Sequence, residues 1–444
     1  MRANFGFKGN RLTGHLGSAR LEQRIRRTEY ALCVLAATAL SFSGIYSTMS
    51  AFFFILAAVG LIALRPIDNA RVLLVFALLL ALPLLAIAST VWSDAPSRTL
   101  RAGMQLFITF AAAIILAKRC PPELLIGTLM VSVMVIGIQI MPYVPDTLAN
   151  GYPLRGPLGS KNALGFTAQL GVLLSFATLL NPEMPRPLRI AALIFLPYFF
   201  WLINLSQSAG SLTSTAIFLF VFFSSLALGR FPMTVRWTAT VIMLVVIAVL
   251  YPYLADLSES LAGAGTQALG KDTTLTGRTM LWRVAEDFAS RRPMLGYGYG
   301  SFWRQGYVEA EALWRAFGIR SRMGFNFHNE YIEMRVGLGV VGMGLLIATN
   351  VGIFLLSIYR QLTTPSVTIA FFLALQTAFY ARTFAEDGLV APFSETTVLW
   401  IASAAYCAMW SPQARTSIAA AAQRMKLPRE ALRRVRDARM PRRT

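Results

Sequence analysis

The residues best suited to chemistry fall within one stretch, Thr276 to Gly342, which is flanked by long apolar segments. His328 stands out there because it is one of only two histidines in the protein. An imidazole can accept a proton or orient a hydroxyl group, although a lone histidine can equally be structural. No second histidine lies nearby to share a metal ion, so we expect neither a metal site nor a cofactor.

Arg278 is the second residue that could act on a ligand. Thr276 is typical of a helix N-cap, and the residues after it predict a short helix that ends before Pro293. Arg278 then lies in the first turn, where its charge opposes the helix dipole, a cost that a bound anion would offset. The alternative is an ordinary surface arginine. If the chain is also helical at His328, Arg335 follows two turns later on the same face.

A third candidate is the sequence Gly-Pro-Leu-Gly-Ser-Lys-Asn at residues 156–162, which precedes an apolar segment. Free N–H groups at a helix N-terminus bind phosphate, and Arg155 and Lys161 would strengthen such a site. In the alternative interpretation the glycines and the serine only cap the helix, while Lys161 extends toward the membrane surface. The sequence leaves both interpretations open.

Aromatic residues are concentrated in the run Gly-Tyr-Gly-Tyr-Gly-Ser-Phe-Trp at residues 296–303. No strand–helix unit flanks this run, so it is not a dinucleotide-binding fingerprint. We expect a turn that presents Tyr297, Tyr299 and Trp303 to the membrane interface or to sugar rings. The glycines that follow, from Gly337 to Gly344, predict a slim helix that packs closely against a neighbour.

The elements that must position these residues are membrane spans. Of the 444 residues, 56% are hydrophobic and only 14% are charged, whereas soluble domains have about 25% charged residues. The net charge of +20 lies mostly in two tails and in short loops, which is typical of segments facing anionic lipids and argues against nucleic-acid binding. Cys33, Cys120 and Cys407 are too few and too widely spaced for a disulfide framework.

Apolar runs of roughly 20 residues predict about twelve membrane-spanning helices and an all-α polytopic membrane protein. A basic tail (1–29) precedes nine spans within 30–254, a large loop covers 255–330, three spans lie within 331–410, and a second basic tail covers 411–444. The predicted spans are approximately 30–46, 47–64, 70–91, 100–117, 123–142, 163–180, 188–205, 211–229, 236–254, 334–357, 365–383 and 394–410.

The loops predict the orientation. With the N-terminus in the cytoplasm, every predicted cytoplasmic loop carries lysine or arginine, for example Arg71 and Arg186, as the positive-inside rule requires. Both termini are then cytoplasmic, and the large loop lies on the outer face. Arg155, Lys161 and Arg382 are basic residues at outer ends of spans, which suggests an anion bound just outside the bilayer.

Three classes of function fit a protein of this kind: a membrane enzyme, a transporter or flippase of lipid-linked sugars, and a structural scaffold. Transporters commonly show internal repeats and ionisable groups near the membrane midplane, and the sequence shows neither. A scaffold leaves the outer arginines unexplained. An enzyme that handles an anionic substrate at the outer face is therefore favoured.

Taken together, these segments resemble the bacterial O-antigen ligase and polysaccharide polymerase superfamily. The resemblance follows the chain in order, from Ser89-Thr90-Val91-Trp92-Ser93 and the Gly-Ser-Lys-Asn motif at 159–162 to Ser206-Gln207-Ser208, Gly277-Arg278, Gly296-Tyr297-Gly298 and His328-Asn329. His328-Asn329 is spaced to Gly339 and Gly342 as in the ligase signature, in which nine residues separate His-Asn from Gly-x-x-Gly. Each motif alone is weak evidence for the superfamily, but the order of the motifs along the chain is specific to it.

This resemblance implies a bundle of the GT-C type with a large periplasmic loop between late spans, in the inner membrane of a bacterium. It implies metal-independent, inverting transfer of a glycan from a polyprenyl-diphosphate donor. By position, Arg278, Arg155, Lys161 and Arg335 would bind the diphosphate, and His328, with Arg278, would be catalytic. Sugar or acceptor contacts would come from Asn329, Tyr297, Tyr299, Trp303, Arg382 and Glu386.

Within the superfamily, two features favour the exopolysaccharide polymerases. These are the aromatic run at 296–303 and Ser208-Ala209-Gly210, where ligases often have arginine. Arg382 and Glu386, in the last outer loop, also fit polymerases. The expected acceptor is then another lipid-linked glycan, with lipid A-core as the ligase alternative and a protein acceptor as a third.

Overall fold

The structure is a computed structural model that describes residues 10–246, residue 249 and residues 274–409. Within these residues all regular elements are helices, and no strand is present. Parts of the predicted domains lie outside the described residues: 1–9 of the first tail, 247–248 and 250–254 of the ninth span, 255–273 of the large loop, residue 410 of the last span and the whole second tail at 411–444.

The helices follow the predicted spans. In chain order they are α1 (Asn10–Ser41), α2 (Ser47–Leu64), α3 (Pro66–Val75), α4 (Ala81–Ala88), α5 (Pro96–Arg119), α6 (Pro122–Ile140), α7 (Val144–Asn150), α8 (Lys161–Leu180), α9 (Arg186–Ser206), α10 (Ala209–Leu228), a helix at Met233–Val246, α12 (Thr274–Arg291), α13 (Val308–Ala316), α14 (Glu330–Thr363), α15 (Val367–Thr383) and α16 (Glu395–Met409). Short 3-10 turns include η1 (Phe42–Gly44) and η4 (Gly156–Leu158).

Seven helical stretches within the described residues are long and apolar enough to cross a membrane: α2, α5, Pro122–Asn150, α8, α9, α10 and α14. Shorter apolar helices occupy Ala81–Val91, Met233–Val246 and α15. Each predicted span coincides with helix over its described part, although the span at 70–91 is divided between α3 and α4. The prediction of an all-α polytopic membrane protein is therefore confirmed.

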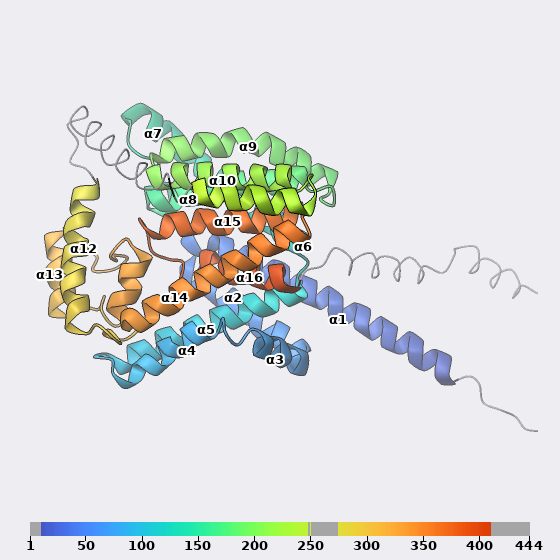
Figure 1. The fold of residues 1–444 in the computed structure, drawn as a ribbon, viewed down its shortest axis with the longest axis horizontal. Helices are drawn as coiled ribbons and strands as arrows, with labels where there is room; N and C mark the ends of the chain where they lie inside the picture. The colour runs from blue at the N-terminus through green and yellow to red at the C-terminus, as the bar shows by residue number, and fades with distance from the viewer. Residues whose placement is uncertain (1–9, 247–248, 250–273, 410–444) are drawn as a thin grey trace, which may run out of the picture.

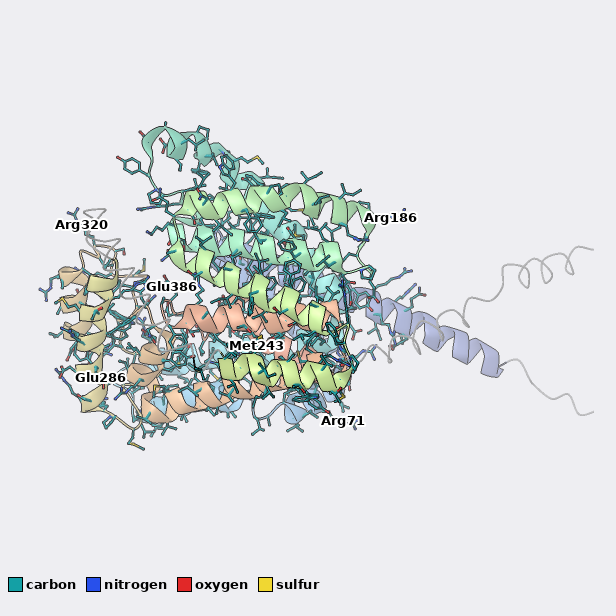
Figure 2. The ribbon with its side chains drawn as sticks, turned by 45° about the horizontal axis from the view of Figure 1, so that its top comes forward. Arg71, Arg186, Met243, Glu286, Arg320 and Glu386 are labelled. Atoms are coloured by element: carbon teal, nitrogen blue, oxygen red, sulfur yellow. The ribbon has the colours of Figure 1, made fainter. Side chains whose placement is uncertain are left out.

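The long helices pack side by side, and α12 and α13 stand across one end of them (Figure 1). Figure 2 shows that Glu386, Glu286 and Arg320 lie at this end, whereas Arg71 and Arg186 lie at the opposite end. Residues from predicted outer and inner loops are thus separated along the bundle. Large buried rings fill its interior, for example Phe110 against Trp400, whose centroids are 5.8 Å apart.

The glycine-rich run joins the α12–α13 region to the bundle. Helix α14 is broken at Gly339, where φ is 67°, and the N–H groups of Val340 and Val341 after the break donate to the carbonyls of Pro293 and Met294, at 2.8 and 3.3 Å. The N–H groups of Tyr297 and Gly298 donate to the carbonyls of Val336 and Gly337, at 3.0 and 2.8 Å. A Cβ atom on Gly339 would lie 2.2 Å from the carbonyl oxygen of Met294, so only glycine fits.

A second, smaller core holds the α12–α13 region together. Leu281 and Ala285 of α12 are buried against aromatic rings that follow it in the chain, among them Phe302 and Phe327. Trp282 donates from its indole N–H to the carbonyl of Phe327 at 2.8 Å. A helix that ends before Pro293 is confirmed, but Thr276 is not its N-cap, because the helix already includes Thr274, and Arg278 lies beyond its first turn. The bond from Trp282 ties this helix to the residue just before His328.

Candidate functional site

Glu386, in the loop between α15 and α16, is the centre of a polar cluster. One carboxylate oxygen accepts from Arg278 Nη2 at 2.8 Å and from Asn162 Nδ2 at 2.8 Å. The other oxygen lies 3.3 Å from His328 Nδ1. Only 15% of the Glu386 side chain is exposed, against 21% for Arg278 and 27% for His328. Residues far apart in the sequence therefore converge on one carboxylate.

Local backbone structure fixes each partner. His328 has a φ of +52°, a left-handed conformation, and its N–H donates to Asn326 Oδ1 at 2.8 Å. Asn329 is the N-cap of α14, because its side-chain oxygen accepts from the N–H groups of Tyr331 and Ile332. His328 is thus held immediately outside the helix. Its imidazole leaves Nε2 free of any hydrogen bond from the described residues.

The loop that carries Glu386 is anchored by a buried carboxylate. Glu330, the first residue of α14, is 1% exposed and accepts from the N–H groups of Gly388 and Leu389 at 2.8 Å each. Its other oxygen accepts from the N–H of Val390 at 3.3 Å. The Asn329 amide also donates to the carbonyl of Phe384, at 3.2 Å. The start of α14 therefore positions both His328 and the Glu386 loop.

The pKa values of the two neighbouring acids of this loop, Glu386 and Asp387, are shifted in opposite directions. Burial opposes ionisation of Glu386, but the hydrogen bond with His328 and the charges of Arg278 and Arg382 outweigh it and lower its pKa. Burial raises the pKa of Asp387 to about 6, with Glu386 adding to the rise and His328 and Arg382 opposing it. Glu386 is therefore stabilised as an anion by its partners, whereas burial disfavours the ionised form of Asp387.

A cavity of about 250 Å³ opens beside this cluster. Its wall includes Arg382 and Glu386, with Phe166 of α8 and Ser41 at the end of α1. The Arg382 guanidinium lies 4.8 Å from the centre of the Phe166 ring, which holds it in place. The arrangement offers positive charge, a carboxylate-bound imidazole and a partly open cavity at one end of the bundle.

The structure separates the predicted diphosphate-binding residues. Arg278 is in the cluster, and Lys161 is the first residue of α8, next to Asn162. Arg155 is exposed and has no ion-pair partner among the described residues. Arg335 does not share a face with His328, because α14 begins only at Glu330; it pairs instead with Glu286 of α12 at 2.7 Å.

The predicted presentation of Tyr297 and Tyr299 to the membrane interface is wrong, because both are buried, whereas their contact with sugar rings stays a prediction. Tyr297 and Tyr299 are 5% and 7% exposed, and the Tyr299 hydroxyl donates to the carbonyl of Val390 at 2.9 Å. Their rings turn inward because the backbone of this run pairs with the break in α14. Trp303 is half-buried, and its indole N–H donates to Glu333 at 3.1 Å. Asn329, predicted to contact sugar, is committed to capping α14 and to the Phe384 carbonyl.

Two residues of the cluster were not singled out from the sequence. Asn162 belongs to the Gly-Ser-Lys-Asn motif, yet its neighbour Lys161 drew the attention because of its charge. Asn162 bridges Glu386 to α10, since its oxygen also accepts from the Ser208 hydroxyl at 3.3 Å. Asp387 follows Glu386 directly, and nothing in its sequence context reveals its burial.

Comparisons with known proteins identify the family of this chain. The family model described as O-antigen ligase matches residues 190–347, which include Arg278 and His328 but not Glu386. The chain is also 32% identical over 323 residues to the exopolysaccharide production protein ExoQ of Rhizobium meliloti (strain 1021). That match covers 70% of this chain and 72% of the relative. The protein belongs to the O-antigen ligase family of membrane enzymes of surface-polysaccharide synthesis.

Proposed function

We propose that this protein transfers a glycan from a polyprenyl-diphosphate carrier to a hydroxyl group of an acceptor sugar, at the periplasmic face of the bacterial inner membrane. The observation that carries the proposal is the convergence of Arg278 and His328 on Glu386, beside the cavity that Arg382 lines. A diphosphate ester needs positive charge to leave, and an acceptor hydroxyl needs a group to take its proton. The cluster offers both.

The proposed reaction is a single displacement. The acceptor oxygen attacks the anomeric carbon and forms the new glycosidic bond, while the bond from that carbon to the diphosphate oxygen breaks with its electron pair. Arg278 and Arg382 stabilise the charge that develops on the diphosphate; one such donor in a partly dry site contributes about 3–4 kcal/mol. His328, oriented through Nδ1 by Glu386, takes the acceptor proton at Nε2.

In this proposal the side chains supply the charge, and transfer needs no metal ion. The anomeric configuration inverts, because one displacement places the acceptor on the face opposite the diphosphate. Lys161, at the start of α8, is close enough in sequence to Asn162 to assist the diphosphate. Arg155 and Arg335 have no part in it.

Membrane placement belongs to the same proposal. With α12, α13 and Glu386 at the periplasmic end of the bundle, Arg71 and Arg186 lie at the cytoplasmic end, as the positive-inside rule requires. The segment 255–330 then forms the periplasmic loop between the spans within 30–254 and those within 331–410. The tails at 1–29 and 411–444 are cytoplasmic.

The acceptor favoured here is a second lipid-linked glycan, so that the enzyme polymerises exopolysaccharide or O-antigen repeat units. The relative's name, exopolysaccharide production protein, supports this choice. The family description, O-antigen ligase, supports the alternative acceptor, lipid A-core. Both reactions use the same donor chemistry.

The test uses purified protein in detergent with lipid-linked repeat units from a strain that lacks this enzyme, in the presence of EDTA. A mass-spectrometric ladder of longer glycans without lipid A-core identifies a polymerase, and a single transfer that requires lipid A-core identifies a ligase. Arg278→Ala should lose about 10²–10³-fold in rate and His328→Ala about 10²–10⁴-fold. Arg283→Ala, an exposed arginine on the same helix, is the matched control. Full activity in both site variants would refute the assignment.

A further inference from the structure

A second cavity, of about 480 Å³, lies on the other side of the loop that carries Glu386. One wall is the first three turns of α5, with Arg101 and Gln105, and the opposite wall is the start of α14, with Glu330 and Glu333. Trp303 and Tyr299 also line it. Because Asp387 and Gly388 line it, the second cavity lies at the same end of the bundle as the catalytic cluster.

The two cavities share one ridge. Asp387 and Gly388 line both of them, and the Glu330 carboxylate fixes the ridge through the N–H groups of Gly388 and Leu389. A group bound in the second cavity could therefore meet a group bound in the first at this ridge, next to Glu386 and His328. Such a pair of adjoining spaces suits an enzyme that joins two large substrates.

The lining of the second cavity suits a saccharide. Arg98 is committed to the wall, since its guanidinium donates to the carbonyls of Gly300 and Trp303 at 2.8 and 2.7 Å. Arg101 and the Gln105 amide, by contrast, have no ion pair or side-chain hydrogen bond among residues 10–246 and 274–409. An aromatic ring held rigidly beside free hydrogen-bonding groups is the usual means of binding sugar rings, which have apolar faces and polar edges.

The surroundings distinguish which cavity takes which substrate. The first cavity is bordered by Ser41 and Gly44, and Phe42 between them lines an apolar groove between α1 and α2. Met49 and Phe53 in that groove are 61% and 38% exposed, as expected of a surface that contacts lipid. The first cavity therefore adjoins a surface suited to a polyprenyl tail. Half of the residues that line the second cavity are charged, amide or aromatic, and Arg101 and Gln105 are among them.

We infer that the second cavity binds the acceptor saccharide, with Arg101 and Gln105 as its recognition residues and the Asp387–Gly388 ridge as the point where the acceptor meets the donor. This inference rests on the proposed function, because it assigns the second substrate of that reaction. The other ionisable groups that face the ridge are His328, Arg382 and the buried Glu330 and Glu333.

The test separates acceptor binding from donor binding. The acceptor probe is an oligosaccharide of one or two repeat units, released by mild acid from the polymer of the source bacterium, and binding is followed by saturation-transfer NMR. The donor probe is polyprenyl diphosphate, and its binding is followed as thermal stabilisation of the protein. Arg101→Ala and Gln105→Ala should each weaken oligosaccharide binding and raise the apparent KM for acceptor about tenfold. Their stabilisation by polyprenyl diphosphate should remain that of the wild type.

Arg283→Ala serves as the surface control and should match the wild type in both measurements. Loss of polyprenyl-diphosphate stabilisation in Arg101→Ala would mean that the second cavity holds the donor, and unchanged oligosaccharide binding in both cavity variants would mean that it holds neither substrate. Either result overturns the inference. The proposed function fails by a different result, namely unaltered polyprenyl-diphosphate stabilisation and unaltered transfer in Arg278→Ala.

Discussion

Asp387 and Glu386 are adjacent acids whose neutral replacements should change stability in opposite directions. Burial raises the pKa of Asp387 from 3.8 to about 6, so the folded protein resists its ionisation. This cost is absent below the unfolded value, grows as the pH rises, and is complete above about pH 6. A shift of this size corresponds to about 3 kcal/mol. Asp387→Asn should therefore stabilise the protein by up to that amount at neutral pH.

Glu386 should behave in the opposite way. Its pKa is lowered in the fold, so its ionised form contributes stability above the unfolded value of 4.5 that is lost as the pH falls through the folded value. In Glu386→Gln the amide cannot accept from both Arg278 and His328. Loss of hydrogen bonds to charged groups should cost roughly 2 kcal/mol at neutral pH.

Thermal unfolding in detergent, at pH 7.5 and near pH 4, measures both effects. At pH 7.5 the melting temperature should rise in Asp387→Asn and fall in Glu386→Gln, and at the lower pH the rise should disappear. Since Asp387 lies on the proposed ridge, Asp387→Asn should also transfer glycan more slowly than the wild type. Destabilisation of Asp387→Asn at pH 7.5 would refute the reasoning, because it would show that the buried carboxylate is favourably bound.

Three further predictions follow from the site and its supports. Gly339→Ala should prevent normal folding, because a Cβ atom there meets the Met294 carbonyl and φ is positive. Gly344→Ala, at a helical position with open space around it, should stabilise the folded protein by up to about 1 kcal/mol. Melting curves of the two variants in detergent test both expectations. Glu330→Gln should release the ridge, seen as faster amide exchange at residues 388–390 and lower transfer in a protein that still inserts. Arg335→Ala should change neither polyprenyl-diphosphate binding nor glycan transfer. It should lower the stability of the protein by about 0–1 kcal/mol, because the partner of Arg335 is an exposed glutamate. A weaker affinity for polyprenyl diphosphate in this variant would show that Arg335 binds the donor.

Much of the architecture could be predicted from the sequence. Apolar length predicts which segments cross a membrane, and each of the twelve predicted spans is mostly helical over its described part, with the span at 70–91 divided between α3 and α4. The existence of the helix that carries Arg278 and its end before Pro293 were also predictable, but its start at Thr274 precedes the predicted cap at Thr276. The ordered motifs identified the family, and the comparisons confirm it. These features depend on local composition and spacing, which can be read directly from the chain.

Contacts between distant segments could not be predicted in this way. From the sequence, Arg335 was a candidate for binding diphosphate, and the tyrosines of the glycine-rich run were candidates for contacting sugar. Only the packing shows that Arg335 pairs with Glu286 and that Tyr297 and Tyr299 are buried. The inward turn depends on backbone hydrogen bonds to a break in α14, more than thirty residues later in the chain.

The site itself combines both kinds of information. Sequence alone singled out His328, Arg278 and Glu386 as separate candidates, each with an ordinary alternative. Their meeting on one carboxylate, with Asn162 as a fourth member, depends on how α8, α12, α14 and the loop after α15 pack at one end of the bundle. Side-chain type determines what chemistry a residue can do, and the tertiary structure decides which residues do it together, because charges interact strongly only at short range in a partly dry site.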